Sequence, residues 1–177
     1  DLEDVRRAVE TTGQRCLAEP VELADPLATK AFCAKITETF GKVDVLVNSA
    51  GVYLDRGTVA ESNPDHWWNT IEVNLRGPYM MTRHLLSAMP EGGKIINFST
   101  GKALTAGTNS ASYHVSKAGL HMLTEALANE LWPQGIDVNN IVPGPVATAT
   151  LSREDPRERS TPEALLERYK DAPPNGL

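Results

Sequence analysis

Three short apolar runs in this chain each end in small or polar residues, and helical patterns lie between them. The runs are residues 43–51, 93–100 and 135–148, the last of which breaks at Pro143 and Gly144. Strands of a parallel sheet that is covered on both faces have nearly continuous apolar sequences. Alternation of such strands with helices is typical of α/β folds, whose sites lie at the carboxyl ends of the strands. The sequence therefore predicts a parallel sheet with a site where the three runs end.

Three helical segments are expected from the sequence pattern. They cover residues 26–40, 64–89 and 111–132. In the last segment, one stripe is formed by Leu120, Leu123, Leu127 and Leu131. From the pattern alone, this stripe is expected to cover the sheet, and another face of the same helix stays available for other contacts.

Tyr113 and Lys117 are the residues that most directly indicate chemistry. If residues 110–117 are helical, both side chains lie on one face, a turn apart. The ordinary pKa of a tyrosine is about 10, and a nearby ammonium favours the phenolate. Lowering that pKa to near neutrality takes about 4 kcal/mol, which one partly buried cation and one further positive group can supply. The pair predicts a tyrosine prepared for proton transfer, although the same spacing also occurs in ordinary helices.

Five motifs, in this order, resemble those of the short-chain dehydrogenase/reductase family, and they span essentially the whole chain. The family's Asn-Asn-Ala-Gly turn is matched, with Ser in place of the second Asn, by Asn48, Ser49, Ala50 and Gly51. Asn74 matches the family's helical active-site Asn, and Thr100 matches its hydroxyl residue at the end of a strand. Tyr113 and Lys117 match its Tyr–Lys pair. The family's loop on the nicotinamide side is matched by Pro143, Gly144, Val146 and Thr148. The resemblance implies a Rossmann-like doubly wound parallel sheet. It also implies one dinucleotide-binding domain over residues 1–177, with a substrate lid at residues 149–177.

The resemblance assigns catalytic roles to these residues. Tyr113 is expected to give or take the hydroxyl proton as general acid or base, and Lys117 to lower the pKa of the tyrosine and bind the nicotinamide ribose. Asn74 is expected to hold a water that passes the proton to solvent. A hydroxyl at the end of the second run should orient the substrate oxygen. In the family this hydroxyl residue normally lies 13 residues before the tyrosine, and Thr100 stands at that position here. We favour Thr100 over Ser99 because neighbouring residues on a strand face opposite ways.

The cofactor that the resemblance implies is NAD or NADP, and the sequence does not separate the two. Glu22 stands where the family usually has an Asp near the adenine, and Leu23 is expected to contact the same ring. The other expected cofactor contacts are Asn48, Ala50, Gly51, Tyr113, Lys117, Pro143, Gly144, Val146 and Thr148.

A Gly-rich phosphate-binding turn is not found in this sequence. Gly13 is isolated, and Gly92 and Gly93 open a strand instead of joining a strand to a helix. The first residues resemble the family's second helix, and the strand expected near residues 15–21 would be cut off from its neighbour. We therefore expect the first two strands and the last strand of the sheet to lie outside this sequence, as parts of a longer protein.

Composition excludes several functional classes. The net charge of −6 and the pI near 5.2 argue against binding to nucleic acid. No apolar run is long enough to cross a bilayer, so we expect no membrane partner. The histidines and the two cysteines, Cys16 and Cys33, have no metal-site or redox spacing, which predicts no metal site and free thiols in the cytoplasm.

Two functional hypotheses follow from these observations. The first is an NAD(P)-dependent oxidoreductase that transfers hydride between a nicotinamide cofactor and a secondary alcohol or ketone, assembled as a homodimer or homotetramer. The second is a catalytically idle fragment or family-derived binding module without affinity for the cofactor. Asn74, Tyr113 and Lys117 favour the first hypothesis, whereas the lack of a phosphate-binding turn favours the second.

Overall fold

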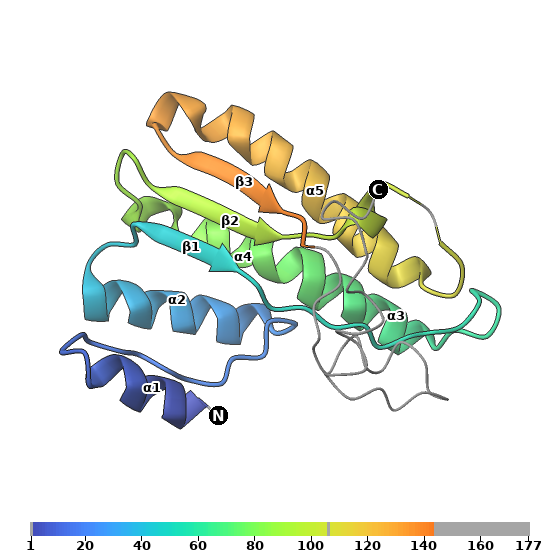
Figure 1. Ribbon diagram of the computed structural model, residues 1–177, viewed down its shortest axis with the longest axis horizontal. Coiled ribbons are helices and arrows are strands. Elements are labelled where there is room, and N and C mark those ends of the chain that lie inside the picture. The colour runs from blue at the N-terminus through green and yellow to red at the C-terminus, as the bar shows by residue number, and fades with distance from the viewer. Residues whose placement is uncertain (1, 106, 144–177) are drawn as a thin grey trace, which may run out of the picture.

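The computed structural model describes residues 2–105 and 107–143, and its sheet has three parallel strands in the order β1-β2-β3 (Figure 1). The strands are β1 (Val45–Asn48), β2 (Lys94–Phe98) and β3 (Asp137–Ile141). Each predicted apolar run contains one strand, and the prediction of a parallel α/β sheet is confirmed. Since adjacent parallel strands point the same way, their carboxyl ends lie side by side at one end of the sheet.

The helical segments expected from the sequence are present. They are α1 (Leu2–Glu10), α2 (Pro26–Phe40), α3 (Pro64–Ile71), α4 (Gly77–Leu85) and α5 (Ala111–Leu131). Short 3₁₀ turns are Leu86–Ala88, Gly101–Ala103 and Trp132–Gln134. The segment between β1 and β2 is not one regular helix, because a π-helical turn, Glu72–Arg76, separates α3 from α4. Among the residues that the structure describes, we find no helix with the length and apolar character that crossing a lipid bilayer requires.

The start and end of α2 follow from its local sequence. The Asp25 carboxylate accepts hydrogen bonds from the backbone N–H groups of Leu27 (2.8 Å) and Ala28 (3.3 Å), and Pro26 takes the first helical position. An acidic cap and a proline at this place favour a helix start. Gly41 ends the helix with a φ of 81°, which glycine adopts without strain. These caps explain why the expected bounds of α2 agree with the observed ones.

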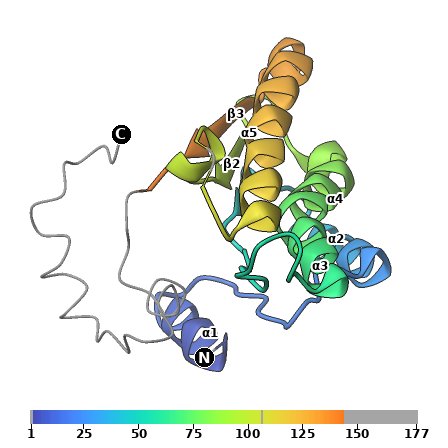
Figure 2. The same ribbon diagram turned by 90° about the vertical axis from the view of Figure 1, so that its right-hand side faces the viewer.

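Helices α2, α4 and α5 cover one face of the sheet, as the turned view shows (Figure 2). α2 packs on α4, while α5 packs on β3 and on α3. Along the strands, Leu46, Ile95 and Val138 are buried toward the helices, and the alternate residues are more exposed. The buried members of this core are Cys33, Leu46, Leu85, Ile95, Leu131, Ile136 and Val138. The core therefore lies between one face of the sheet and the three helices.

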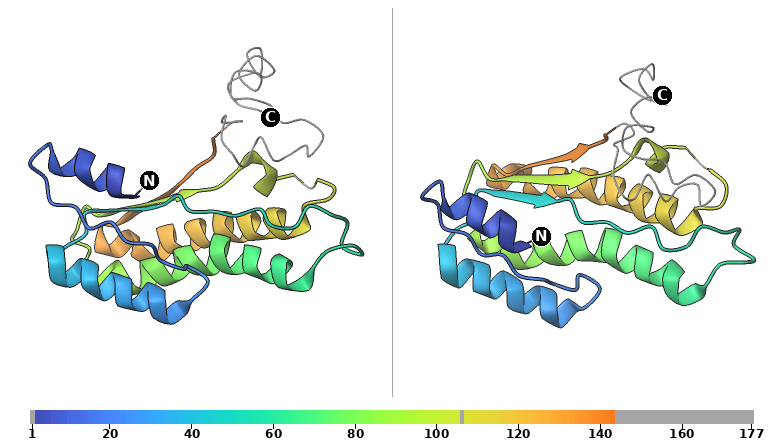
Figure 3. Two further views of the ribbon diagram at one scale, coloured as in Figure 1. Left: turned by 90° about the horizontal axis from the view of Figure 1, so that it is seen from below. Right: turned by 60° about the horizontal axis from the view of Figure 1, so that its bottom comes forward.

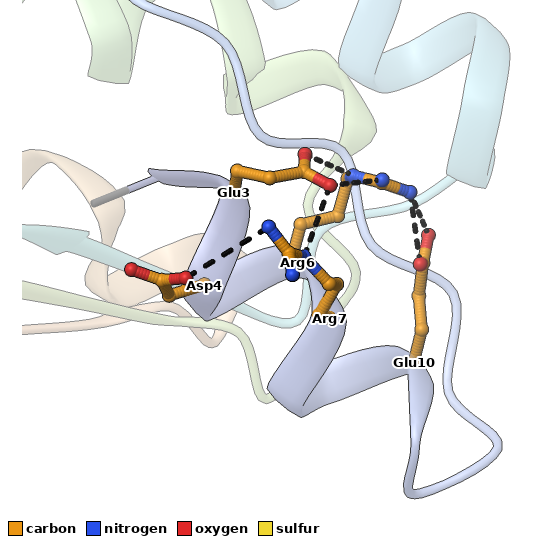
Figure 4. A network of polar contacts seen from close by, with 5 residues as sticks. All are labelled: Glu3, Asp4, Arg6, Arg7 and Glu10. Carbon is orange, nitrogen blue, oxygen red and sulfur yellow. Dashed lines mark hydrogen bonds and ion pairs between the residues drawn. The ribbon is translucent and has the colours of Figure 1, made fainter.

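Helix α1 lies beyond the β1 edge, on the other side of the sheet from α2, α4 and α5 (Figure 3). None of its described residues is buried. Ion pairs within the helix stabilise it instead: Arg6 contacts Glu3 (2.6 Å) and Glu10 (2.9 Å), and Arg7 contacts Glu3 (3.3 Å) and Asp4 (3.9 Å) (Figure 4). Exposed pairs of this spacing contribute little each, so α1 is the least firmly packed of the described helices.

Residues 15–21, expected as a strand, form none. A strand is stabilised by ladder hydrogen bonds to a neighbour, and the described sheet ends at β1. The segment instead connects α1 to α2 as irregular chain. Arg15 attaches it to the end of α2, where its guanidinium donates to the carbonyl of Thr39 and lies 5.0 Å from the centre of the Phe40 ring.

A row of asparagines crosses the buried face of the sheet. Asn48, Asn97 and Asn140 are register partners on β1, β2 and β3. Asn48 Nδ2 donates to Asn97 Oδ1 (2.8 Å), and Asn97 Nδ2 donates to the hydroxyl of Thr124 on α5 (2.8 Å). The single proton of this hydroxyl faces two acceptors, the carbonyl of Leu120 (2.8 Å) and Asn140 Oδ1 (2.9 Å). This network, whose central residue Asn97 is fully buried, joins all three strands to α5.

Asn97→Ala should lower the free energy of unfolding by about 3 kcal/mol, because it leaves the amide of Asn48 and the hydroxyl of Thr124 without their buried partner. Asn129 on α5 is exposed and provides a matched control, since the same substitution there should change stability by less than about 0.5 kcal/mol. Urea unfolding followed by circular dichroism measures both. Equal costs for the two variants would contradict the importance of the network.

Candidate active site

Tyr113 and Lys117 lie one turn apart near the start of α5, in the helix that was predicted over residues 111–132. Lys117 Nζ lies 6.0 Å from the centre of the Tyr113 ring and donates to the backbone carbonyl of Phe98, the last residue of β2, at 2.7 Å. The lysine is 5% exposed, and the tyrosine is half-buried. The pair thus stands at the carboxyl end of β2, with the ammonium inside the protein.

Burial lowers the pKa of Lys117 from its usual 10.5 to about 8. Desolvation disfavours the charged ammonium, and one hydrogen bond to a carbonyl replaces only part of the water that the ammonium has lost. Lys117 is therefore mostly charged at pH 7 and loses its charge as the pH rises past about 8.

Asn74 lies in the π-helical turn and is fully buried. Its Oδ1 accepts from the N–H of Val52 (2.7 Å) and its Nδ2 donates to the Val52 carbonyl (2.8 Å), so the side chain pairs with the loop after β1. Nδ2 also donates to the hydroxyl of Ser116 (3.1 Å), which donates to the Tyr113 carbonyl (2.8 Å). One chain of hydrogen bonds thus connects the loop, the π-helical turn and α5. Turns of this kind are rare and occur frequently at functional sites.

The turn after β1 brings its backbone against these side chains. A Cβ added to Gly51 would lie 3.4 Å from Asn74 Oδ1 and 3.5 Å from Lys117 Nζ. Ala50 and Gly51 are exposed, whereas Asn48 is buried in the asparagine row. The predicted turn residues therefore have different surroundings. Gly51 lies beside the Asn74 and Lys117 side chains, whereas Asn48 is hydrogen-bonded to Asn97 within the sheet.

The two hydroxyl residues at the end of β2 have different surroundings. Ser99 is 5% exposed, and its Oγ donates to the carbonyl of Lys117 at 3.4 Å. Thr100 is half-buried, and its carbonyl accepts from the N–H of Ala103 at 3.0 Å as the chain turns into the 3₁₀ segment. The burial of Ser99 against α5 leaves Thr100 better placed to meet a substrate, and the choice between them stays a prediction.

The two residues predicted to contact adenine lie in the turn before α2. Glu22 is exposed, and its Oε1 accepts from the N–H of Ala24 at 3.0 Å. Leu23 packs on Gly77, where an added Cβ would come within 3.2 Å of the Leu23 Cβ. Arg76, which the sequence did not single out, donates to the carbonyl of Ala24. These contacts attach the predicted adenine turn to the residues that follow Asn74 in the chain.

Tyr53 is not among the residues predicted from the sequence, yet it contacts Tyr113 directly. The two rings stack with their centres 5.0 Å apart and 28° between their planes. The Tyr53 hydroxyl donates to the carbonyl of Asn109 (3.2 Å), and the guanidinium of Arg56 lies 4.2 Å from the centre of the Tyr53 ring. An aromatic residue two positions after Gly51 is the only sequence signal for this contact, and no local pattern connects it to Tyr113.

Part of the predicted site lies outside the described residues. Pro143 is exposed just beyond β3, and the chain from 144 onward includes Gly144, Val146, Thr148 and the predicted lid at residues 149–177. In the described ranges, no group of three or more His, Cys, Asp or Glu side chains could hold a metal ion. Cys16 and Cys33 are free thiols, as predicted.

Known proteins with similar sequences identify the family. A family model described as Enoyl-(Acyl carrier protein) reductase matches residues 1–171. L-rhamnose 1-dehydrogenase (NAD(P)(+)) from Sphingomonas sp. strain SKA58 is 36% identical over 155 residues, covering 83% of this chain and 58% of that protein. The chain belongs to the short-chain dehydrogenase/reductase family.

Other members of the family agree in sequence and in fold. Acetoacetyl-CoA reductase from Allochromatium vinosum is 40% identical over 124 residues, covering 68% of this chain and 50% of that protein. The blue fluorescent protein from a metagenomic library, solved in complex with NADPH, has a TM-score of 0.83 and 31% identity over 90% of this chain and 64% of its own. A Serratia marcescens short-chain dehydrogenase/reductase has a TM-score of 0.79 and 35% identity over 84% of this chain and 60% of its own. The predicted Rossmann-like fold is confirmed, and this chain spans between half and two thirds of the length of these relatives.

Lys117→Met should be more stable than the parent protein at pH 7, and the difference should shrink by about 2 kcal/mol between pH 7 and pH 9.5. Below pH 8 the lysine is charged in both the folded and the unfolded state, so the whole free-energy cost of burying the ammonium lowers the stability of the folded state. Between about pH 8 and 10.5 the unfolded chain still binds the proton that the folded protein has lost, and stability then rises with pH.

Urea unfolding of both proteins at the two pH values, without added ligand, measures this change. Lys30→Met, at an exposed position of α2, is the control and should show no such dependence on pH. A difference for Lys117→Met that stays constant or widens with pH would contradict the burial of a charged lysine.

Proposed function

We propose that the protein is an NAD(P)-dependent oxidoreductase that transfers hydride between a nicotinamide cofactor and a secondary alcohol or ketone. The observation that carries the proposal is the placement of Tyr113 beside the buried ammonium of Lys117, next to Asn74 and Gly51 at the strand ends. Two relatives support the substrate class, one named as a dehydrogenase of L-rhamnose and one as a reductase of acetoacetyl-CoA. A structural neighbour in complex with NADPH supports the cofactor class.

The described residues fit a nicotinamide cofactor at the strand ends. Gly51 carries no side chain where the loop passes Asn74 and Lys117, so a ligand can approach the backbone closely. Lys117 gives one N–H to Phe98 and has two more that would bind the ribose hydroxyls. The turn that contains Glu22 would hold the adenine. When bound, the cofactor supplies or accepts the hydride, and the protein provides position and electrostatics.

Tyr113 moves the proton in this proposal. In the reducing direction its hydroxyl gives a proton to the carbonyl oxygen, and in the oxidising direction its phenolate takes the proton from the alcohol. The ammonium of Lys117 favours the phenolate electrostatically. The hydroxyl of Thr100, with Ser99 as the alternative, donates a hydrogen bond to the same substrate oxygen and stabilises its developing charge.

Asn74 has two roles in this proposal: its amide positions the neighbouring segments, and its Oδ1 has room to accept a hydrogen bond from a water. Both of its amide hydrogens are engaged, by the carbonyl of Val52 and the hydroxyl of Ser116. Its Oδ1 accepts one hydrogen bond, from the N–H of Val52, and an amide oxygen can accept two. The water that returns the proton to Tyr113 would therefore bind to the second acceptor position of Oδ1.

Self-association is part of the proposal, through the helices between β1 and β3. These helices expose large apolar side chains, among them Trp68 (62% exposed), Val115 (50%) and Met122 (61%). Sedimentation equilibrium at micromolar concentration should therefore give a mass two or four times that of the protomer. Met122→Lys should weaken the association, because it places a charge in an apolar contact. A parent protein that sediments as a monomer would contradict this part of the proposal.

Tyr113→Phe should lower turnover by at least about 10²-fold while leaving cofactor binding unchanged, because only the transferable proton is removed. Oxidation of secondary alcohols with NAD or NADP, followed at 340 nm, measures turnover. Quenching of protein fluorescence by the reduced cofactor measures binding. Tyr79→Phe, at a half-exposed position of α4 (46% exposed), removes the same hydroxyl elsewhere and should leave both quantities unchanged.

Two results would separate the functional hypotheses. Normal turnover in Tyr113→Phe would show that the role assigned to this tyrosine is wrong. A parent protein that folds but binds neither NAD(H) nor NADP(H) would favour the alternative, a binding module or idle fragment of the family.

A further inference from the structure

The loop after β1 places an aromatic ring against Tyr113. Tyr53 lies in this loop, and its ring stacks on the Tyr113 ring at 5.0 Å between centres and 28° between planes. This geometry is within the range in which aromatic pairs attract each other beyond the burial of their area. The two residues are 60 positions apart in the chain, so the contact depends on the tertiary fold.

Tyr53 is itself held in place from two further directions. Its hydroxyl donates to the carbonyl of Asn109 at 3.2 Å, in the segment that leads into α5. The guanidinium of Arg56 lies 4.2 Å from the centre of its ring, at the distance of a cation–π interaction. Asn109 adopts a φ of 61°, a left-handed conformation in which asparagine is enriched. The hydrogen bond to Asn109 and the contact with Arg56 therefore both support the Tyr53 ring.

The Tyr113 ring is only partly enclosed by the protein, and Tyr53 covers one of its faces. Tyr113 is the third residue of α5 and only half-buried, whereas Lys117, one turn later, is buried. A half-buried aromatic side chain near the start of a helix has more than one accessible rotamer. Proton transfer requires the phenol oxygen to stay within hydrogen-bond reach of the substrate oxygen, and a misplacement of about 1 Å can cost about 100-fold in rate.

We propose that Tyr53 is a positioning residue that holds the ring of Tyr113 in its reactive orientation by stacking against it. The inference rests on the proposed function, since it assigns to Tyr53 the support of the proposed acid and base. It goes beyond that function because it names a residue of the loop after β1, outside the five motifs, as a determinant of kcat. The ring of Tyr53 provides the support, and its hydroxyl and Arg56 keep that ring in place.

Ring-removing and ring-keeping variants test the proposal. Tyr53→Leu should lower kcat by about 2- to 12-fold, the range that an aromatic pair contributes, with KM changed less than kcat. Tyr53→Phe keeps the stacked ring and loses only the hydrogen bond to Asn109, so it should retain most of kcat. Tyr53→Met, which has a similar length and no ring, replaces Tyr53→Leu should that variant fail to fold.

An activity-independent readout is fluorine NMR of the protein labelled with 3-fluorotyrosine. Tyr113→Phe identifies the signal of position 113, which the neighbouring ring should shift. Tyr53→Leu should move this signal toward the position of a solvent-exposed fluorotyrosine, and Tyr53→Phe should leave it near its place in the parent protein. Tyr79→Leu is the control, because it removes a ring on α4 and should leave the signal of position 113 unchanged.

The outcomes separate this inference from the proposed function. If Tyr113→Phe abolishes turnover while Tyr53→Leu keeps both kcat and the fluorine signal of position 113, the inference is wrong and the proposed function stands. An equal loss of kcat in Tyr53→Phe and Tyr53→Leu also overturns it, because the ring alone would then not be the support. If no variant affects turnover because the parent has none, the proposed function fails and the fluorine signal alone decides whether Tyr53 holds Tyr113.

Discussion

The amide of Asn74 is the interaction on which the candidate site depends. It exchanges two hydrogen bonds with the backbone of Val52, as a strand neighbour would, and gives a third to Ser116. Three segments far apart in the sequence, the loop after β1, the π-helical turn and the start of α5, are thereby joined at one buried group. Because Asn74 is fully buried, each lost bond would leave a buried polar atom without its protein partner. The geometry around Tyr113 is therefore set by the same amide to which the proposed function assigns the proton-carrying water.

A second constraint is the conflict between the stability of the fold and the charge of Lys117. A lysine that is 5% exposed and bonded to one carbonyl destabilises the folded state as long as it is charged. The same burial strengthens its electrostatic effect on neighbours, because the effective dielectric constant is lower inside the protein than in water. Local instability of this kind is common where a group serves function more than folding. The hydrogen-bonded asparagine row, with Asn48 and Asn97 buried close by, opposes that instability by joining β1, β2 and β3 to α5.

Local sequence patterns predicted most of the fold, and tertiary contacts account for what they missed. The bounds of α2 follow from Asp25, Pro26 and Gly41, and the three strands follow from apolar runs, because both signals act within a few residues. The spacing of Tyr113 and Lys117 predicted their shared helix face for the same reason. The π-helical turn, the stacking of Tyr53 and the contact of Arg76 with Ala24 could not be predicted, since each depends on residues that only the folded chain brings together. A strand expected at residues 15–21 from the family resemblance is absent, because a strand needs a neighbour to bond with and the described sheet ends at β1.

The π-helical turn also restricts how the length of this chain can change. On its amino-terminal side α3 packs against α5, and on its carboxyl-terminal side α4 packs against α2. An α-helix turns by about 100° per residue, so one residue more or less between α3 and α4 rotates one packed face away from its partner. Deleting a single residue from Glu72–Arg76 would restore a regular helix and yet put the two faces out of phase. Insertions and deletions should for this reason be poorly tolerated within this helix, even though the helix would look more regular without the extra residue.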